Sequence, residues 1–85
     1  MDSQRAVHSG PAEAETVVVK SCQLVLGRPT VRADDDFYVI GGTSLSLIRV
    51  ITELMDAGYD VDIEQIPVGA SLTIRQLAAA VSRSD

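Results

Sequence analysis

The amino-acid sequence predicts an all-α fold, a small four-helix bundle of three main helices and one short helix with a long loop between helices 1 and 2. Apolar residues recur at helical spacing in three segments, which begin near Ala12, Ser44 and Thr73. The composition is 46% hydrophobic but only 4% aromatic, so aliphatic side chains must fill the core. A chain of 85 residues has room for one such core.

Composition also limits the partners. The formal net charge of -5 argues against nucleic acid and anionic membranes, which are bound through accumulated Lys and Arg. No apolar run is long enough to cross a bilayer and the N-terminus lacks the order of a signal peptide, so we expect a cytoplasmic protein, and a monomer. The one cysteine, Cys22, is expected to be a buried or half-buried thiol, and with a single distant histidine, His8, it predicts no metal site.

The first helix is expected from about Ala12 to Leu26. Residues 1–11 show no periodicity and end in Gly-Pro, which predicts a flexible tail before a domain of residues 12–83. Three successive valines at 17–19 would also suit a strand, but the segment is too long for one and has acidic residues in its first turn. Helix is therefore favoured. Its inner face is expected to consist of Ala14, Val17, Val18, Ser21, Leu24 and Val25.

A long connection, residues 28–43, follows the first helix. Loops of this length in compact domains are usually functional or held down by their own side chains. Phe37 and Ile40 are the expected anchors. The run Asp34-Asp35-Asp36 predicts a solvated surface rather than a Mg²⁺ site, because three consecutive loop residues do not by themselves converge on one ion.

The second helix, predicted from Ser44 to Ala57, carries two apolar stripes. One is the expected core face and consists of Leu47, Val50, Ile51, Leu54 and Ala57. The other shares its side with Ser44, and an apolar stripe beside a candidate modification site suits partner docking. The residues expected to dock partners are Leu45, Ile48 and Thr52, whereas Met55 is expected to be covered by the preceding loop.

The last third of the chain contains two predicted helices. Residues 62–66 predict a short helical turn that is capped by Asp62 and stopped near Pro67. Thr73 and Gln76 match a capping box at the start of the final helix. Its expected core positions are Ile74, Leu77, Ala78 and Val81. Residues 82–85 are expected to fray.

Ser44 is the residue on which the function depends. It follows Gly41, Gly42 and Thr43 at the expected start of a helix, where free N–H groups and the helix dipole favour an attached anion. The two glycines remove side-chain bulk, so the backbone can turn and a large partner can approach the hydroxyl. On local chemistry alone, helix capping by Thr43 and Ser44 is the commoner use of such residues.

The surrounding pattern decides between these uses. Residues 35–45, Asp-Asp-Phe-Tyr-Val-Ile-Gly-Gly-Thr-Ser-Leu, resemble the phosphopantetheine attachment segment of peptidyl carrier proteins, the thiolation domains of nonribosomal peptide synthesis. The resemblance extends on both sides of the glycines and covers roughly residues 13 to 82. The chain departs from the common pattern at Thr43, around Ile66-Pro67 and in the stretch before Thr73. These departures bear on the choice of partners.

The resemblance implies a carrier domain without catalysis of its own. It implies that a phosphopantetheinyl transferase attaches 4'-phosphopantetheine from coenzyme A to Ser44, with Gly41, Gly42 and Thr43 as local support. An adenylation enzyme would then load an amino or aryl acid as a thioester, and condensation or tailoring enzymes and a thioesterase would collect it. Because the chain opens with Met1 and carries no neighbouring domain, we expect a free-standing carrier of a secondary-metabolite pathway, although a domain excised from a larger synthetase would have much the same sequence.

Three alternatives compete with this interpretation. A polyketide acyl carrier would use the same serine and fold, and loading assays would separate the two carriers. A small helical DNA-binding or regulatory module is disfavoured, because the seven Lys and Arg are scattered along the chain. A hydrolase with Ser44 as nucleophile requires a base and an oxyanion site, and the sequence places no histidine nearby.

Overall fold

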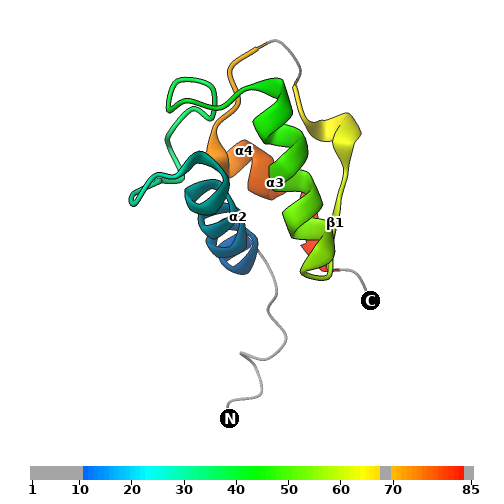
Figure 1. Cartoon of the computed structure of the whole chain (residues 1–85). Coiled ribbons are helices and arrows are strands. Elements are labelled where there is room, and N and C mark those ends of the chain that lie inside the picture. Colours follow the sequence, from blue (N-terminus) through cyan, green and yellow to red (C-terminus); the bar gives the residue numbers. More distant parts are fainter. Residues whose placement is uncertain (1–10, 68–69, 84–85) are drawn as a thin grey trace.

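Three α-helices, one 3₁₀ helix and a two-stranded sheet make up the described part of the chain, residues 11–67 and 70–83, in a computed structural model (Figure 1). The α-helices are α2 (Pro11–Leu26), α3 (Ser44–Asp56) and α4 (Ile74–Ala79). The remaining elements are β1 (Tyr59–Val61), the 3₁₀ helix η1 (Ile63–Gln65) and β2 (Val81–Arg83). No helix among the described residues is both long enough and apolar enough to cross a membrane.

The core lies where α2 packs against both α3 and α4. Most of the apolar residues that recur at helical spacing point inward, as the sequence predicted. The largest side chains that are completely buried are Val18, Cys22, Phe37, Val50, Leu54, Leu72, Ile74 and Leu77. Two of these, Phe37 and Leu72, come from connecting segments. The core therefore fixes the two connections that lie next to Ser44 as well as the helices.

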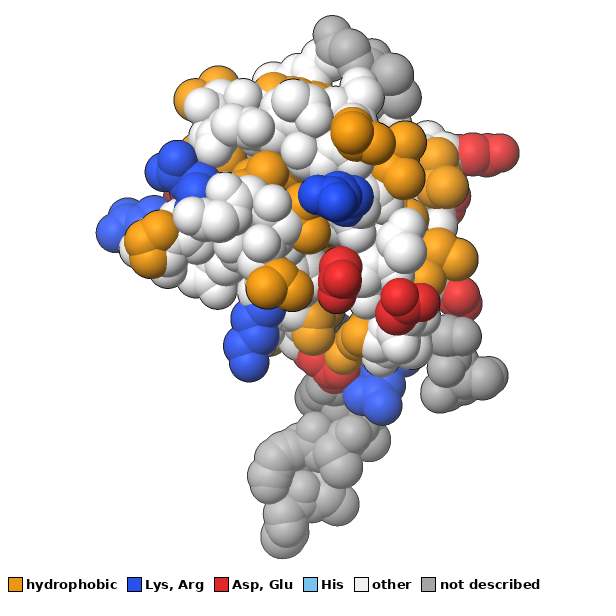
Figure 2. All heavy atoms as spheres, viewed as in Figure 1, with side chains coloured by type: hydrophobic (Ala, Val, Ile, Leu, Met, Phe, Trp, Pro, Cys, Tyr) orange, Lys and Arg blue, Asp and Glu red, His pale blue; other side chains and the backbone are white. Residues whose placement is uncertain are grey.

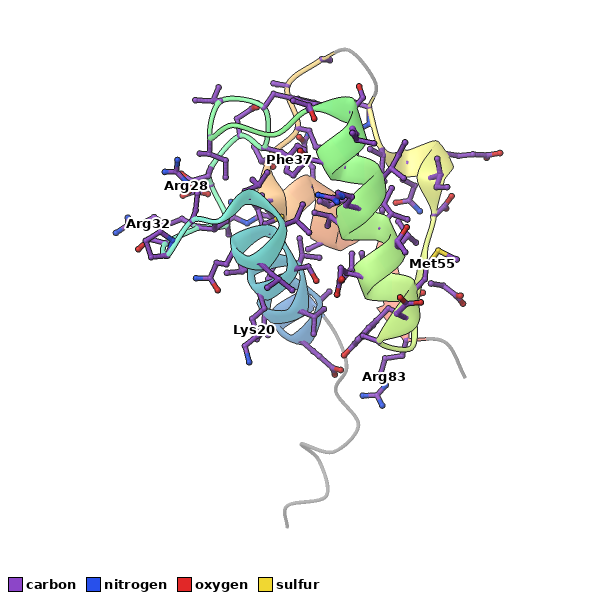
Figure 3. All side chains as sticks on the ribbon, viewed as in Figure 1. Lys20, Arg28, Arg32, Phe37, Met55 and Arg83 are labelled. Carbon is purple, nitrogen blue, oxygen red and sulfur yellow. The ribbon has the colours of Figure 1, made fainter. Side chains whose placement is uncertain are left out.

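Three predictions of helix faces are wrong. Leu24 is 70% exposed, because it follows the buried Cys22 by two residues and so falls on the opposite side of α2. Ala57 is exposed, because it caps α3 beyond the helix's last turn. Met55 is 57% exposed, and its side chain lies at the surface at the far end of α3 from the 28–43 loop that was expected to cover it (Figure 3).

The final helix is shorter than predicted. α4 ends at Ala79, and the residues after it form β2, which pairs with β1 in antiparallel register with Val61 opposite Val81. The Asp62 N–H also donates to the carbonyl oxygen of Ala80 (2.7 Å). The residues after Ala79 therefore pair with β1 and its next residue instead of extending α4. Val81 is buried as its spacing predicted, but in a strand. The fold is a small helical domain with a short sheet, which the all-α prediction did not include.

The predicted helix starts are confirmed, with one shift. At α4, the Gln76 N–H donates to Thr73 Oγ1 (3.0 Å) and the Thr73 N–H donates to Gln76 Oε1 (2.8 Å), which completes the capping box. At η1, Asp62 accepts from the Glu64 N–H (3.2 Å). α2 begins at Pro11, one residue inside the predicted tail. The rest of that tail, with His8, and the end of the chain from residue 84 lie outside the described residues.

Candidate functional site

The loop before Ser44 is joined by backbone hydrogen bonds to the segment that leads into α4. The Phe37 N–H donates to the carbonyl oxygen of Leu72 (2.7 Å), and the Ile74 N–H donates to that of Asp35 (2.9 Å). These bonds flank an antiparallel bridge between positions 36 and 73. The bridge connects two segments far apart in the sequence and holds the loop against the start of α4.

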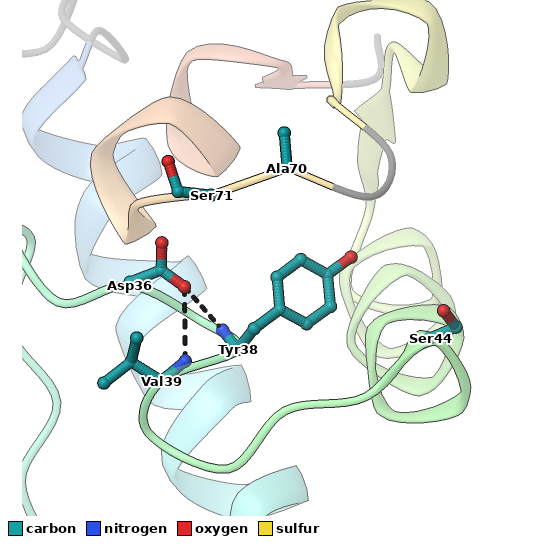
Figure 4. A pocket seen from close by; sticks show the side chains of 6 residues that line it. All are labelled: Asp36, Tyr38, Val39, Ser44, Ala70 and Ser71. Atoms are coloured by element: carbon teal, nitrogen blue, oxygen red, sulfur yellow. Dashed lines mark hydrogen bonds between the residues drawn. The ribbon is translucent and has the colours of Figure 1, made fainter.

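The Asp36 carboxylate also holds this loop in place, through hydrogen bonds to backbone N–H groups. It is partly buried and accepts three backbone N–H groups, from Tyr38 (2.9 Å), Val39 (3.2 Å) and Leu72 (3.0 Å), the first two of which are drawn in Figure 4. An ionised acceptor forms stronger hydrogen bonds than a neutral one. The prediction of a solvated surface is therefore wrong for Asp36, whose carboxylate ties the loop to the segment before α4.

The other two aspartates of the run have separate partners. Asp34 is exposed and pairs with Arg75, whose guanidinium pKa is raised chiefly by this hydrogen bond. Asp35 accepts the Arg32 N–H (2.8 Å). No group of three or more metal-ligating side chains gathers anywhere in residues 11–67 and 70–83. The three carboxylates thus hold chain segments in place and do not converge on one point.

The two glycines before Ser44 serve different purposes. Gly41 has a φ of 111°, a backbone conformation that residues with a side chain rarely adopt. Gly42 is buried, and a Cβ atom there would lie 2.3 Å from a ring carbon of Phe37. Phe37 is fully buried and Ile40 packs against the core, so both predicted anchors are confirmed. Gly42 therefore lets the loop close over the Phe37 ring, and it does not open space for a partner as the sequence suggested.

Thr43, and not Ser44, caps α3. Thr43 has an extended backbone, and its Oγ1 accepts the Ser46 N–H (3.1 Å). Ser44 is the first residue of the helix and is exposed, and its hydroxyl has no hydrogen-bond partner among the described residues. Helix capping therefore does not explain Ser44. Its hydroxyl is displayed to solvent at the positive end of the helix dipole.

The described surroundings of Ser44 supply no base that could make it a nucleophile. The carboxylate that lines the adjoining groove is that of Asp36, and both of its oxygens accept backbone N–H groups. Cys22 is completely buried, and burial raises the pKa of its thiol to about 12, so it is not a nucleophile at neutral pH. The arrangement suits a hydroxyl that another enzyme modifies.

The outer face of α3 next to Ser44 is apolar and open. Leu45 is 67% exposed and Ile48 59%, and Figure 2 shows hydrophobic side chains over the part of α3 nearest Ser44. Thr52 is exposed, and its Oγ1 donates to the carbonyl oxygen of Ile48 (2.9 Å), which leaves its methyl group to extend this surface. The structure thus places the three predicted docking residues on one exposed face.

The prediction missed a further exposed residue beside this face. Leu24 of α2 lines a groove of about 400 Å³ between α2 and α3, together with Val25, Ile48, Arg49, Thr52 and Glu53. The sequence did hold a signal for Leu24, because residues two apart on a helix do not share a face and Cys22 was expected inside.

The fold and the site together define a small carrier domain in which an exposed serine stands at the start of a helix. The chain belongs to the phosphopantetheine attachment site family, whose profile matches residues 16–81. Proteins of this family carry 4'-phosphopantetheine as a covalently bound group. The predicted family and cofactor are therefore confirmed.

Comparison with known proteins places the chain near nonribosomal peptide synthetases. It is 34% identical to tyrocidine synthase 1 of Brevibacillus parabrevis over 79 residues, which are 93% of this chain and 7% of that protein. It is 33% identical to syringomycin synthase SyrB1 of Pseudomonas syringae pv. syringae over 75 residues, 88% of this chain and 12% of that protein. The chain thus spans a small part of these relatives. A solved structure described as a non-ribosomal PCP domain has a TM-score of 0.69 and 26% identity, and the match covers 86% of this chain and 92% of that one.

Proposed function

We propose that Ser44 receives the 4'-phosphopantetheine arm and that this domain then carries an amino or aryl acid on the arm as a thioester. The observation that carries the proposal is the exposed Ser44 hydroxyl, which lacks a partner among the described residues because Thr43 caps the helix. The similarity to nonribosomal peptide synthetases supports an amino or aryl acid over a polyketide unit as cargo.

The start of α3 fits a phosphodiester. The Ser46 N–H is engaged by Thr43 Oγ1 and the Leu47 N–H by the carbonyl oxygen of Thr43, so the N–H groups of Ser44 and Leu45 remain for an anion. The first turn of α3 contains no acidic residue that would repel one. Backbone donors and the helix dipole would thus stabilise the negative charge of the attached group.

The transfer itself is a substitution at phosphorus. Ser44 Oγ would attack the phosphorus of coenzyme A that bears the pantetheine, so that a new O–P bond forms while the bond to the adenosine bisphosphate breaks. The serine proton would pass to a base of the transferase or to water, since no described residue of this chain is placed to take it. This chain contributes the acceptor and its position, and the chemistry belongs to the transferase.

A thioester on a flexible arm suits delivery between enzymes. The tether raises the effective concentration of the acyl group at each docked partner. The expected partners are the transferase, an adenylation enzyme, condensation or tailoring enzymes and a thioesterase, and each must dock and leave. A surface as small as that of Leu45, Ile48 and Thr52 suits such weak, exchangeable contact.

The experiment that tests the attachment is intact-mass analysis after incubation with coenzyme A and a promiscuous phosphopantetheinyl transferase. We expect the parent to gain the mass of one arm and the Ser44→Ala variant to gain none. Ser46→Ala is the matched control, because it removes a neighbouring hydroxyl and keeps the backbone N–H that Thr43 caps. A parent of unchanged mass, or an arm on Ser44→Ala, would contradict the proposal.

Thiol titration gives a second measurement on the native protein. Cys22 is the one cysteine of the chain. Because it is buried and its pKa is raised, we expect almost no reaction with a thiol reagent near neutral pH. The holo protein should therefore show one fast-reacting thiol that the apo protein lacks. Loading of that thiol by an adenylation enzyme with an amino or aryl acid, and not by a polyketide acyltransferase, would support the proposed cargo.

A further inference from the structure

The groove between α2 and α3 contains residues of α2 that the proposed function does not use. It has a volume of about 400 Å³, and Leu24 and Val25 of α2 line it together with α3 residues that include Ile48. Leu24 is 70% exposed. A single exposed leucine is common on protein surfaces, but here it joins other apolar side chains at the edge of a groove. The groove therefore has room for an apolar side chain of another molecule.

Positively charged side chains surround this apolar opening. Lys20 is exposed and precedes Leu24 by one turn of α2. Arg28 is exposed and follows the end of the same helix, and Figure 3 shows it on the same side of the molecule as Lys20. Arg49 lines the groove from α3 and is also exposed. An apolar centre thus has cations at its border.

These three cations are not used inside the domain as others are. Within residues 11–67 and 70–83 none of them forms an ion pair, whereas Arg75 pairs with Asp34 and Arg83 with Glu13. The chain has twelve acidic residues for seven basic ones, so carboxylates are not scarce. The charges around the groove are therefore available to a partner.

We propose that the groove between α2 and α3 binds a short acidic segment of a partner protein, through one apolar side chain and the carboxylates beside it. The apolar side chain would pack against Leu24 and Ile48, and the carboxylates would accept hydrogen bonds from Arg28 and Arg49. Arginine suits this task, because its planar guanidinium binds a carboxylate through two N–H groups. Helical segments bind to apolar grooves through side chains three or four residues apart.

Glu53 sets the direction in which such a segment would lie. It also lines the groove, one turn after Arg49 on α3. Because α2 and α3 run in roughly opposite directions (Figure 1), Arg49 lies toward the Arg28 end of the groove and Glu53 toward the Lys20 end. Like charges placed together disfavour binding. The carboxylates of the partner are therefore expected at the Arg28 end.

A short acidic segment fits this groove better than a long polyanion does. Nucleic acids and anionic membranes extend over the whole surface of a small domain, and this chain has a net charge of -5 that repels them. A segment of a few residues meets mainly the charges close to the groove, because salt screens those more than about 10 Å away. Close to the groove, the cations are in excess.

The proposal is tested by NMR titration of the labelled, unmodified full chain with the peptide acetyl-Glu-Glu-Leu-Ala-Ala-Leu-amide. We expect shift changes of the backbone amides at Leu24, Val25 and Arg49 that saturate with peptide concentration. The same peptide with lysine in place of both glutamates is the matched ligand control and should cause no such changes. Binding of the acidic peptide should weaken as salt is added.

Four variants separate local contacts from general effects. Leu24→Asn should weaken binding of the acidic peptide about tenfold through lost apolar burial, and Arg49→Gln about fivefold through a lost charged hydrogen bond. Val39→Asn replaces an aliphatic residue that is 82% exposed on the 28–43 loop, and Arg75→Gln removes one positive charge from α4. These two controls should bind the peptide as the parent does.

The remaining outcomes would overturn the proposal. They are the absence of shift changes with the acidic peptide, changes located away from the groove, equal binding of the lysine peptide, and equal weakening in Arg49→Gln and Arg75→Gln. The last result would mean that only the net charge matters. Because the titration uses the unmodified chain, none of these results bears on the attachment of the arm to Ser44, and a failure of that attachment would leave the groove proposal standing.

Discussion

The residues just before Ser44 are buried and hydrogen-bonded, whereas apolar residues just after it are exposed. Before it, Phe37 and Gly42 are buried against each other and Asp36 accepts three backbone N–H groups. After it, Leu45 and Ile48 are more than half exposed. The loop therefore fixes where the serine stands, and the outer face of the helix is left for other molecules. Substitutions should divide in the same way, between lost stability on one side and lost partner contact on the other.

The largest expected effect is that of a charge placed on the inner face of α3. Leu54 is completely buried, so Leu54→Asp would bury an unpaired carboxylate and leave a cavity, at a cost of about 4 kcal/mol or more. For a domain of this size we expect loss of the folded state, measured as loss of the cooperative melt by circular dichroism. Ile48→Asp introduces the same charge on the outer face and should melt close to the parent. Equal melts for the two variants would contradict the assignment of faces.

The aspartate run allows a sharper test of the buried side. Asp36→Ala removes the acceptor of three backbone N–H groups and should lower the free energy of unfolding by about 2–3 kcal/mol. Asp34→Ala, two residues away, removes an exposed ion pair with Arg75 and should change it by no more than about 0.5 kcal/mol. Urea denaturation measures both. Similar losses in the two variants would show that the Asp36 carboxylate does not hold the loop.

Much of the fold followed from local signals in the sequence. The capping box of Thr73 and Gln76 and the helical spacing of α3 involve residues within a few positions of each other, so they could be predicted. The pairing of Tyr59–Val61 with Val81–Arg83 could not, because each strand is three residues long and its partner lies about twenty residues away. A short strand carries too little pattern of its own, and α4 therefore seemed to continue through Val81.

At the candidate site, too, features that depend on neighbouring residues could be predicted and those that depend on distant residues could not. The position of Ser44 followed from the pattern around it, and Phe37 was expected as an anchor because a long loop in a compact domain is often held down by its own side chains. The role of Asp36 depends on the Leu72 N–H, a partner 36 residues away that the sequence does not indicate. For the same reason Asp36 could not be distinguished from Asp34, which stays at the surface.

The smallest effect on stability, and the most informative for function, is expected on the exposed side. Ile48 follows Ser44 by four residues on the same helix face, about 6 Å further along the axis, so an enzyme that reaches Ser44 must also approach Ile48. Ile48→Asp should change the free energy of unfolding by no more than about 0.5 kcal/mol. It should lower kcat/KM of the phosphopantetheinyl transferase about fivefold, which corresponds to about 1 kcal/mol of lost contact.

Met55→Asp is the control that shows whether a lower kcat/KM in Ile48→Asp comes from a lost contact or from the added negative charge. Met55 is also exposed and receives the same charge, but it lies about 16 Å along the helix axis from Ser44. We expect its kcat/KM to stay near that of the parent. If both variants slow the transferase equally, the cause is the added negative charge acting at long range, and adding salt should restore both. If Ile48→Asp alone is slow and salt does not restore it, the transferase contacts the apolar face beside the serine.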